Sequence, residues 1–377
     1  MGADLRVLSI FGTRPEAVKM APVVQRLAAT DGVVSSVCVT AQHRQMLDQV
    51  LELFDIRPDH DLNLMQPDQP LGELAAAVLT GLEPVLAEVQ PDWIVVQGDT
   101  TTVMAASLLA YFHHVRIGHV EAGLRTGDKW EPFPEEINRR VAGVVADLHF
   151  APTAWARDNL LREGVASERI LVTGNPVIDA LQAIAGRPYD LARGPLASIP
   201  WDRRLILVTA HRRENFGQPI EEIFSALRQI ASDYRGDAHL VYPVHLNPHV
   251  QEPAHRILGG IPNISLIDPL DYLPMVHLMK RAYLVLTDSG GLQEEAPALG
   301  TPVLVLRRVT ERPEAIEAGT ARLVGTDRER ILRETRRLLD HPEERQAMAR
   351  AVNPYGDGHA AERIVEALLQ APRGLRA

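Results

Sequence analysis

Short apolar runs rich in β-branched residues alternate with longer amphipathic segments along most of the chain. In the first half, these runs predict strands at residues 5–11, 33–40, 93–97, 116–121, 148–151 and 170–173. Helix-length amphipathic segments lie between them, at residues 17–29, 71–89, 101–112, 135–145 and 154–163. A strand, a crossover helix and a further strand are typical of a parallel sheet with helices on both faces.

The alternation pauses at residues 186–204, where three prolines and two glycines indicate a connection. It then restarts, with strands predicted at residues 205–209, 240–244, 265–267, 283–287, 302–306 and 323–324. Helices are predicted at residues 219–232, 273–280, 292–299, 328–340 and 343–351. The fold class is therefore α/β, with two doubly wound domains. Since open α/β sheets bind ligands beyond the carboxyl ends of their strands, two such domains facing each other would place a site in the cleft between them.

Composition and charge exclude several classes of protein. Of 377 residues, 46% are hydrophobic and 23% are charged, which is typical of a globular protein and excludes a disordered chain. The 39 Lys and Arg against 49 Asp and Glu give a net charge of −10, the opposite of what a nucleic-acid-binding protein usually carries. No apolar stretch reaches the length of a membrane span.

The cysteine and the histidines of the sequence bear on whether disulfides or metal sites are expected. Cys38 is the only cysteine and lies in an apolar run, so we expect a buried thiol and no intrachain disulfide. The N-terminal residues lack a basic leader, and a cytoplasmic location is expected. His245 and His249 are four residues apart, but Pro248 lies between them and no further ligand completes a set, so we predict no metal site.

Residues 12–16 follow the first predicted strand and open a helix. Thr13 and Glu16 have the spacing of a capping box, which alone explains the segment. Arg14 and Lys19 add two cations near a helix N-terminus, an arrangement suited to binding phosphate. From these residues alone, both interpretations stay open.

Three carboxylates follow strand ends or open helices in the first half. Asp99 lies between a strand and a helix, where an N-cap is the simpler explanation. Glu121 ends a strand among small residues and has no such structural explanation. Glu135 opens a helix, where it complements the helix dipole and stands four residues before Arg139. Together at one sheet edge, the three indicate acid–base chemistry.

The second half carries cations and glycines at equivalent places. His211 and Arg212 follow its first strand, where they suit a diphosphate, although ion pairing of this segment with Glu214 and Glu221 is the plainer alternative. Residues 288–295 open a helix with a serine and two glycines, so backbone N–H groups can approach an anion closely. Neither the dinucleotide fingerprint nor the P-loop pattern occurs anywhere in the chain.

These motifs together resemble the non-hydrolysing UDP-N-acetylglucosamine 2-epimerase family. The resemblance runs from residues 11–16 to residues 353–358 and includes residues 98–102, 119–126, 211–215 and 288–295. It implies a glycosyltransferase-B-like fold of two Rossmann-like domains. The first comprises residues 1–175 together with a C-terminal helix within residues 355–377, and the second comprises residues 176–354. It also implies interconversion of UDP-GlcNAc and UDP-ManNAc, no added cofactor, and a homodimer.

The resemblance implies roles for residues at matching positions. Asp99, Glu121 and Glu135 take the acid–base roles, and His211 serves both catalysis and UDP binding. The other implied ligands of UDP or the sugar are Arg14, Lys19, Ser289, Gly290, Gly291, Glu295 and Arg312. Leu270 and Met275 stand where some relatives have Gln and Phe.

Many bacterial relatives also carry a second UDP-GlcNAc site that activates the enzyme. Its matching positions here are Gln42, Gln45, Arg212 and His245, while Asp68 stands where the site has an arginine. The resemblance therefore implies a weakened regulatory site.

The chemistry of the substrate independently favours a route without a nicotinamide. Carbon C2 of the sugar has no adjacent carbonyl, so an enzyme must either oxidise a neighbouring carbon or expel UDP to form a 2-acetamidoglucal. The missing dinucleotide fingerprint favours elimination, which needs an acid, a base and a site for the diphosphate. A UDP-sugar glycosyltransferase, a hydrolysing epimerase and a non-catalytic nucleotide-sugar sensor stay open as alternatives.

Overall fold

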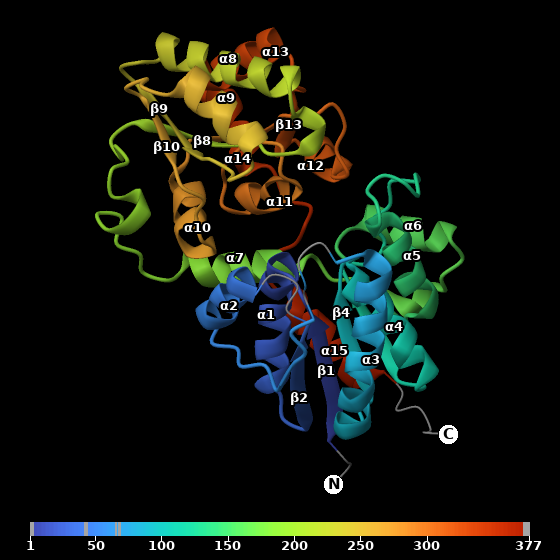
Figure 1. Cartoon of the computed structure of the whole chain (residues 1–377). Helices are drawn as coiled ribbons and strands as arrows, with labels where there is room; N and C mark the ends of the chain where they lie inside the picture. Colours follow the sequence, from blue (N-terminus) through green and yellow to red (C-terminus); the bar gives the residue numbers. More distant parts are fainter. Residues whose placement is uncertain (1–3, 41–43, 65, 67–68, 372–377) are drawn as a thin grey trace. The chain divides into compact units, whose positions relative to one another are not determined.

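The computed structural model describes residues 4–40, 44–64, 66 and 69–371, with residues 44–46 described by their backbone alone. The chain forms two compact units (Figure 1). The first comprises the residues up to Gln182 and those from Tyr355 onward, and the second is Ala183–Pro354. The α/β fold class is confirmed, since each unit is built around a parallel sheet covered by helices.

The first unit contains a seven-stranded parallel sheet in the order β3-β2-β1-β4-β5-β6-β7. Its strands are β1 (Leu5–Phe11), β2 (Val33–Val39), β3 (His60–Asp61), β4 (Trp93–Gln97), β5 (Arg116–Val120), β6 (Leu148–Ala151) and β7 (Ile170–Val172). The strand order reverses between β1 and β4, which pair directly, with Val7 opposite Trp93. A reversal of this kind opens a crevice at the carboxyl ends of the two strands.

Helices cover the sheet because each presents an apolar face at helical spacing. In α3 (Leu71–Val89), for example, Leu74, Val78 and Leu82 are buried at intervals of four. The other helices of the unit are α1 (Arg14–Ala28), α2 (Arg44–Leu53), α4 (Thr101–Phe112), α5 (Glu135–Val145), α6 (Ala154–Arg162), α7 (Pro176–Ala185), which runs on into the second unit, and α15 (Ala360–Gln370).

The C-terminal helix packs on the first unit. Helix α15 contacts α1, and Figure 1 shows the red C-terminal segment among the blue elements. Asp179 of α7 accepts hydrogen bonds from the backbone of Ala360 and Ala361, at 3.2 and 2.9 Å, and so holds the first turn of α15. The backbone N–H of Asn175 donates to the carbonyl of Tyr355 at 2.7 Å.

The second unit repeats the arrangement with six parallel strands in the order β10-β9-β8-β11-β12-β13. These are β8 (Arg204–Thr209), β9 (Ala238–Pro243), β10 (Ile264–Ile267), β11 (Leu284–Thr287), β12 (Val303–Val305) and β13 (Ala321–Leu323). Its helices are α8 (Gln218–Asp233), α9 (Pro248–Leu258), α10 (Tyr272–Arg281), α11 (Gly290–Ala298), α12 (Pro313–Glu317), α13 (Arg328–Asp340) and α14 (Pro342–Arg350). The order reverses between β8 and β11.

Every predicted strand and helix is present, most with ends shifted by one or two residues. The sequence did not predict β3, α2, α7, α9 or α12. The proline-containing start of α9 looked like a loop, but Asn247 caps it by accepting a 2.9 Å hydrogen bond from the N–H of His249. Pro248 is the first residue of the helix, where its missing N–H costs nothing.

Two further sequence expectations concern the cysteine and membrane-spanning helices. Cys38 is fully buried, as expected, and this desolvation raises the pKa of its thiol to about 12. Among the described residues, no helix combines the length and the apolar character needed to cross a membrane.

Candidate functional site

Glu121 lies at the centre of a polar cluster in the first unit. Its Oε1 is 2.6 Å from the ammonium of Lys19 and accepts a 2.8 Å hydrogen bond from Asn175 Nδ2. Its Oε2 accepts a short hydrogen bond from Gln97 Nε2. The residue is only 7% exposed. Donors from three separate segments of the chain therefore hold a nearly buried carboxylate in place.

The sheet topology explains this convergence. Gln97 is the last residue of β4, Glu121 directly follows β5, and β4 and β5 are paired neighbours. Glu121 has a left-handed backbone with φ of 60°, a conformation that is uncommon for residues with a side chain. Strained backbone of this kind is concentrated at functional sites.

Asp99 is a second member of the same sheet edge. Its Oδ2 accepts a 2.5 Å hydrogen bond from Arg139 Nη2, and its side chain is 26% exposed. Burial raises the pKa of Asp99, with Arg139 opposing the shift and the nearby Glu121 adding to it. The N-cap explanation is wrong for Asp99, because Thr100 caps α4 by accepting a hydrogen bond from the N–H of Val103.

Glu135 lies half-buried at the first residue of α5. Its Oε2 is buried and accepts no hydrogen bond from any described residue. Arg139 does not bond Glu135 as the spacing suggested but contacts Asp99 and Glu136. Glu136 in turn is fully buried and accepts from the backbone of Thr126 at 3.1 Å, so it holds the segment before α5 in place.

The capping box at the start of α1 is confirmed. Glu16 is 2% exposed, and its Oε2 accepts from the backbone of Gly12 and Thr13 at 3.2 and 2.7 Å. Its Oε1 accepts a 2.8 Å hydrogen bond from the hydroxyl of Thr100, which joins the exits of β1 and β4. Burial raises the pKa of Glu16 against these hydrogen bonds. Arg14 is the first residue of α1, directly after the N-cap Thr13, and is half-buried.

His119 supports the backbone that carries Asp99. Its Nε2 bonds the carbonyl of Gly98 at 2.7 Å, and burial lowers the pKa of the imidazole to about 4. The neutral ring must therefore donate its proton from Nε2, since a carbonyl only accepts. Gly98 has φ of 78°, a conformation that glycine adopts without strain.

In the second unit, His211, Arg212 and His245 lie together as part of one cluster. The rings of His211 and His245 are stacked with centroids 5.3 Å apart. Asp288, at the exit of β11, accepts from the backbone of His211 and Arg212 at 2.8 and 2.9 Å. Glu214 and Glu221, the alternative ion-pair partners of this segment, instead bond Arg307 at 2.7 Å and Arg256 at 2.5 Å.

Ser289, Gly290 and Gly291 open α11 as predicted, and no side chain caps the helix. A Cβ on Gly290 would lie 3.3 Å from the guanidinium of Arg312, and a Cβ on Gly291 would lie 3.4 Å from Glu295 Oε2. Glycine at both positions therefore leaves room for these two charged side chains next to the free end of the helix. Such an end, with exposed N–H groups, suits an anion.

Hydrogen bonds to neighbouring side chains fix the positions of Arg312 and Glu295. Arg312 donates from Nε to Glu294 at 2.7 Å and from Nη1 to Glu311 at 2.9 Å. The phenol of Tyr272 donates to Glu295 Oε1 at 2.7 Å. Sequence reasoning missed Tyr272, although it lies between Leu270 and Met275 in the segment that departs from some relatives.

Gln42 and Asp68 lie outside the described residues, and the side chain of Gln45 is not described. No group of three or more His, Cys, Asp or Glu suited to a metal ion occurs in the described part of the chain.

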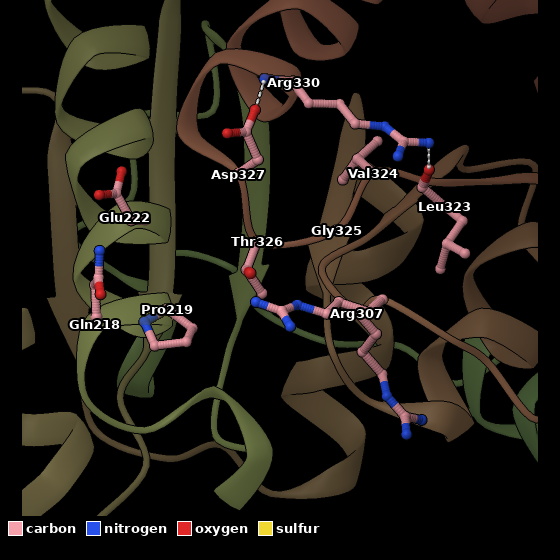
Figure 2. A pocket seen from close by; sticks show the side chains of 11 residues that line it. Gln218, Pro219, Glu222, Arg307, Leu323, Val324, Gly325, Thr326, Asp327 and Arg330 are labelled. Atoms are coloured by element: carbon pink, nitrogen blue, oxygen red, sulfur yellow. Dashed lines mark hydrogen bonds between the residues drawn. The ribbon is translucent and has the colours of Figure 1, made fainter.

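A cavity of about 470 Å³ lies in the second unit, between the start of α8 and the loops after β12 and β13. Arg307, Arg308 and Arg330 contribute to its lining, and Figure 2 shows Arg330 bonded to the carbonyl of Leu323. None of the predicted site residues lines it. Its lining includes no residue of the Glu121 cluster and none of His211, Arg212 and His245.

Comparison with known proteins decides the family. The family model described as UDP-N-acetylglucosamine 2-epimerase matches residues 25–369. The chain belongs to the UDP-N-acetylglucosamine 2-epimerase family. It is 58% identical to the UDP-N-acetylglucosamine 2-epimerase of Escherichia coli K12 over 370 residues, 97% of this chain and 98% of that protein.

Solved structures agree with this family assignment. The epimerase from Neisseria meningitidis bound to UDP-GlcNAc is 47% identical, with a TM-score of 0.89, over 97% of this chain and 100% of that chain. The epimerase from Methanocaldococcus jannaschii in complex with UDP-GlcNAc and UDP is 33% identical, with a TM-score of 0.80, over 97% of this chain and 99% of that chain. The present chain is thus an isomerase, and its fold is the glycosyltransferase-B-like one expected.

The structure of this epimerase adds functional candidates that the motifs did not supply. Gln97 and Asn175 bond Glu121, and Arg139 bonds Asp99, across separations of 24, 54 and 40 residues. Each is a buried polar residue at or just beyond a strand end or on a helix facing the same sheet edge. That signal is visible in a sequence only when the neighbouring strands are known.

Proposed function

We propose that this epimerase interconverts UDP-GlcNAc and UDP-ManNAc by eliminating and re-adding UDP through a 2-acetamidoglucal. The observation that carries the proposal is the pair of carboxylates Asp99 and Glu121, one paired with Arg139 and the other held by three donors. The ligands bound in the related structures, UDP-GlcNAc and UDP, support the choice of substrate.

The reaction divides into two steps that reverse each other. A base takes the proton from C2 while the bond between C1 and the diphosphate oxygen breaks, and UDP leaves with the electron pair. The C1–C2 double bond of the glucal then accepts UDP at C1 again and a proton at C2 on the opposite face. Asp99, Glu121 and Glu135 supply the acid–base groups of this scheme, and the raised pKa of Asp99 brings its carboxyl nearer to the range useful for proton transfer.

UDP needs a site that stabilises the leaving diphosphate. We assign this role to the open N-terminus of α11 at Ser289, Gly290 and Gly291, with Arg312 as a cation, the neutral ring of His211 as a hydrogen-bond partner and Glu295 as an acceptor for sugar or ribose hydroxyls. Arg14 is a further proposed ligand of UDP, as the family resemblance implies. Lys19 contacts Glu121 at 2.6 Å, so we propose that it acts chiefly through that carboxylate.

The active form is proposed to be a cytoplasmic homodimer. Supporting this, Tyr111, Phe112 and Val144, on the contacting helices α4 and α5, are 59%, 64% and 85% exposed. Exposed large apolar side chains on two packed helices favour a protein interface. Light scattering of the purified protein measures the oligomeric state, and a monomer at micromolar concentration would contradict the proposal.

Nuclear magnetic resonance in D2O tests the reaction. Purified protein with UDP-GlcNAc and no added nucleotide cofactor should form UDP-ManNAc and exchange the C2 hydrogen for deuterium. Product that retains its original C2 hydrogen would exclude the elimination route, while free ManNAc would indicate a hydrolysing enzyme. No turnover of UDP-GlcNAc alone would favour a glycosyltransferase that requires an acceptor.

A further inference from the structure

We propose that Asp288 is a positioning residue that sets the tautomer of His211, so that the imidazole presents an unprotonated Nε2 to the bound UDP-sugar. The inference rests on the proposed function, because it gives His211 a proton-accepting role in that reaction. The contacts that support it all lie within the second unit.

The carboxylate of Asp288 is fully buried and firmly oriented. Its Oδ2 accepts three hydrogen bonds, from the backbone of His211 at 2.8 Å, the backbone of Arg212 at 2.9 Å and Asn215 Nδ2 at 3.0 Å. These donors take up one oxygen completely. They also tie the strand exits of β8 and β11 to each other, which fixes the position of the His211 backbone.

The other carboxylate oxygen, Oδ1, bears on which nitrogen of His211 carries the proton. Asp288 Oδ1 is buried and accepts no hydrogen bond from any described residue. Its nearest described partner for an ion pair is Nδ1 of His211, 3.7 Å away, a distance longer than a hydrogen bond but within ion-pair range. A charged acceptor buried without a donor is unfavourable, so a proton on Nδ1, which faces this oxygen, is favoured. The neutral ring then carries its lone pair on Nε2.

Three charged or titratable groups face the ring. Burial lowers the pKa of His211, Asp288 opposes this shift, and His245 and Arg212 reinforce it. The ring is therefore neutral at rest, and Asp288 stabilises the imidazolium once Nε2 accepts a proton. His245 stacks on the ring at an interplanar angle of 16° and is itself held by the N–H of Asn247, which donates to His245 Nδ1 at 3.1 Å.

Replacing Asp288 by Asn reverses the polarity at one atom. The amide oxygen keeps the position of Oδ2, because three donors point at it. The NH2 group then takes the position of Oδ1 and donates to Nδ1 of His211. Asp288→Asn should therefore convert the ring to the Nε2–H tautomer with little change of shape.

The test combines 15N spectroscopy of histidine-labelled enzyme with kinetics. In the parent, the His211 signal, assigned by its absence in His211→Gln, should show the Nδ1–H tautomer, and Asp288→Asn should show Nε2–H. The kcat of Asp288→Asn should fall at least about tenfold, while KM changes less than about threefold, since the loss is in proton transfer. The acid limb of the pH–kcat profile should move as well.

Asn215→Ala is the matched control, because it removes a donor to the same carboxylate and leaves the charge of Asp288 in place. It should keep the Nδ1–H tautomer. An Nε2–H ring in the parent, or equal kcat and pH profiles in the parent and Asp288→Asn, would overturn the inference. A parent that shows the Nδ1–H tautomer but does not epimerise UDP-GlcNAc would contradict the proposed function and leave the tautomer assignment standing.

Discussion

The ammonium of Lys19 lies 2.6 Å from Oε1 of Glu121, and the two side chains are only 15% and 5% exposed. A cation that a sequence motif associates with phosphate thus contacts a carboxylate 102 residues away. Because both side chains are largely removed from solvent, the pair orients the carboxylate more strongly than a surface ion pair would.

Lys19→Met should therefore impair catalysis more than UDP binding. Glu121 keeps Gln97 and Asn175 but loses its cation, so we expect kcat to fall at least about tenfold with a smaller change in the Kd for UDP. Steady-state kinetics and calorimetric titration with UDP separate the two effects. A large loss of UDP affinity at normal kcat would instead show that Lys19 binds the diphosphate.

The same substitution should destabilise the fold, because it removes an ammonium 2.6 Å from a nearly buried carboxylate. We expect the unfolding free energy to fall by up to about 3 kcal/mol, the lower end for a broken buried pair, since Gln97 and Asn175 still donate to Glu121. Arg26→Met is the control: its pair with Glu362 is 3.1 Å long and close to half exposed, and it should cost about 1 kcal/mol or less. Urea unfolding compares the two variants, and equal losses would contradict this account.

Neutralising the proposed acid–base groups should lower kcat selectively. Asp99→Asn, Glu121→Gln and Glu135→Gln should each reduce kcat about 10²–10⁴-fold while the protein stays folded and binds UDP. Glu88→Gln, on the exposed side of α3, removes one charge elsewhere and should leave kcat unchanged. Near-normal turnover in all three variants would place the chemistry at other residues.

Two buried histidines should make the fold sensitive to acid. Burial lowers the pKa of His119 to about 4 and that of His149 to about 3, whereas both rings have a pKa of about 6.5 in the unfolded chain. Between these values the unfolded state binds more protons, so stability falls as the pH falls from about 6.5 towards 4. Above pH 7 both states are neutral and the contribution is constant.

Urea unfolding at several pH values from 7.5 to 4.5 would measure this slope. His119→Gln keeps a donor for the Gly98 carbonyl and should flatten the pH dependence, while His255→Gln, at an exposed position on α9, should leave the slope as in the parent. A slope unchanged in His119→Gln would show that other groups cause the acid sensitivity.

Activation by UDP-GlcNAc should be weak or absent in the reverse direction. Asp68 stands at a position where an arginine would attract a diphosphate, and the exchange of attraction for repulsion is worth about 1 kcal/mol or more. Initial rates with UDP-ManNAc, with and without a trace of UDP-GlcNAc, measure the effect, and Asp68→Arg should increase it. An absolute requirement for the trace in the parent would refute the prediction.

The sequence alone determined the layered α/β plan. The alternation of buried strands and amphipathic helices, and the capping box of Thr13 and Glu16, depend on spacings of two to four residues along one segment. Such local rules act in any tertiary context, which is why the strands and most helices were predictable. The position of Asp99 and Glu121 at strand exits followed in the same way.

Only the tertiary structure decided which side chains meet. Arg139 lies four residues from Glu135 but bonds Asp99, because α4 and α5 pack together and bring Arg139 to the exit of β4. Likewise Lys19, on the helix that follows β1, reaches Glu121 across β4, which separates β1 from β5 in the sheet. Asp288 reaches His211 because β8 and β11 are paired neighbours. Strand order arises from packing across the whole sheet, and no short stretch of sequence records it, so the chemistry of the site depends on contacts that local patterns do not contain.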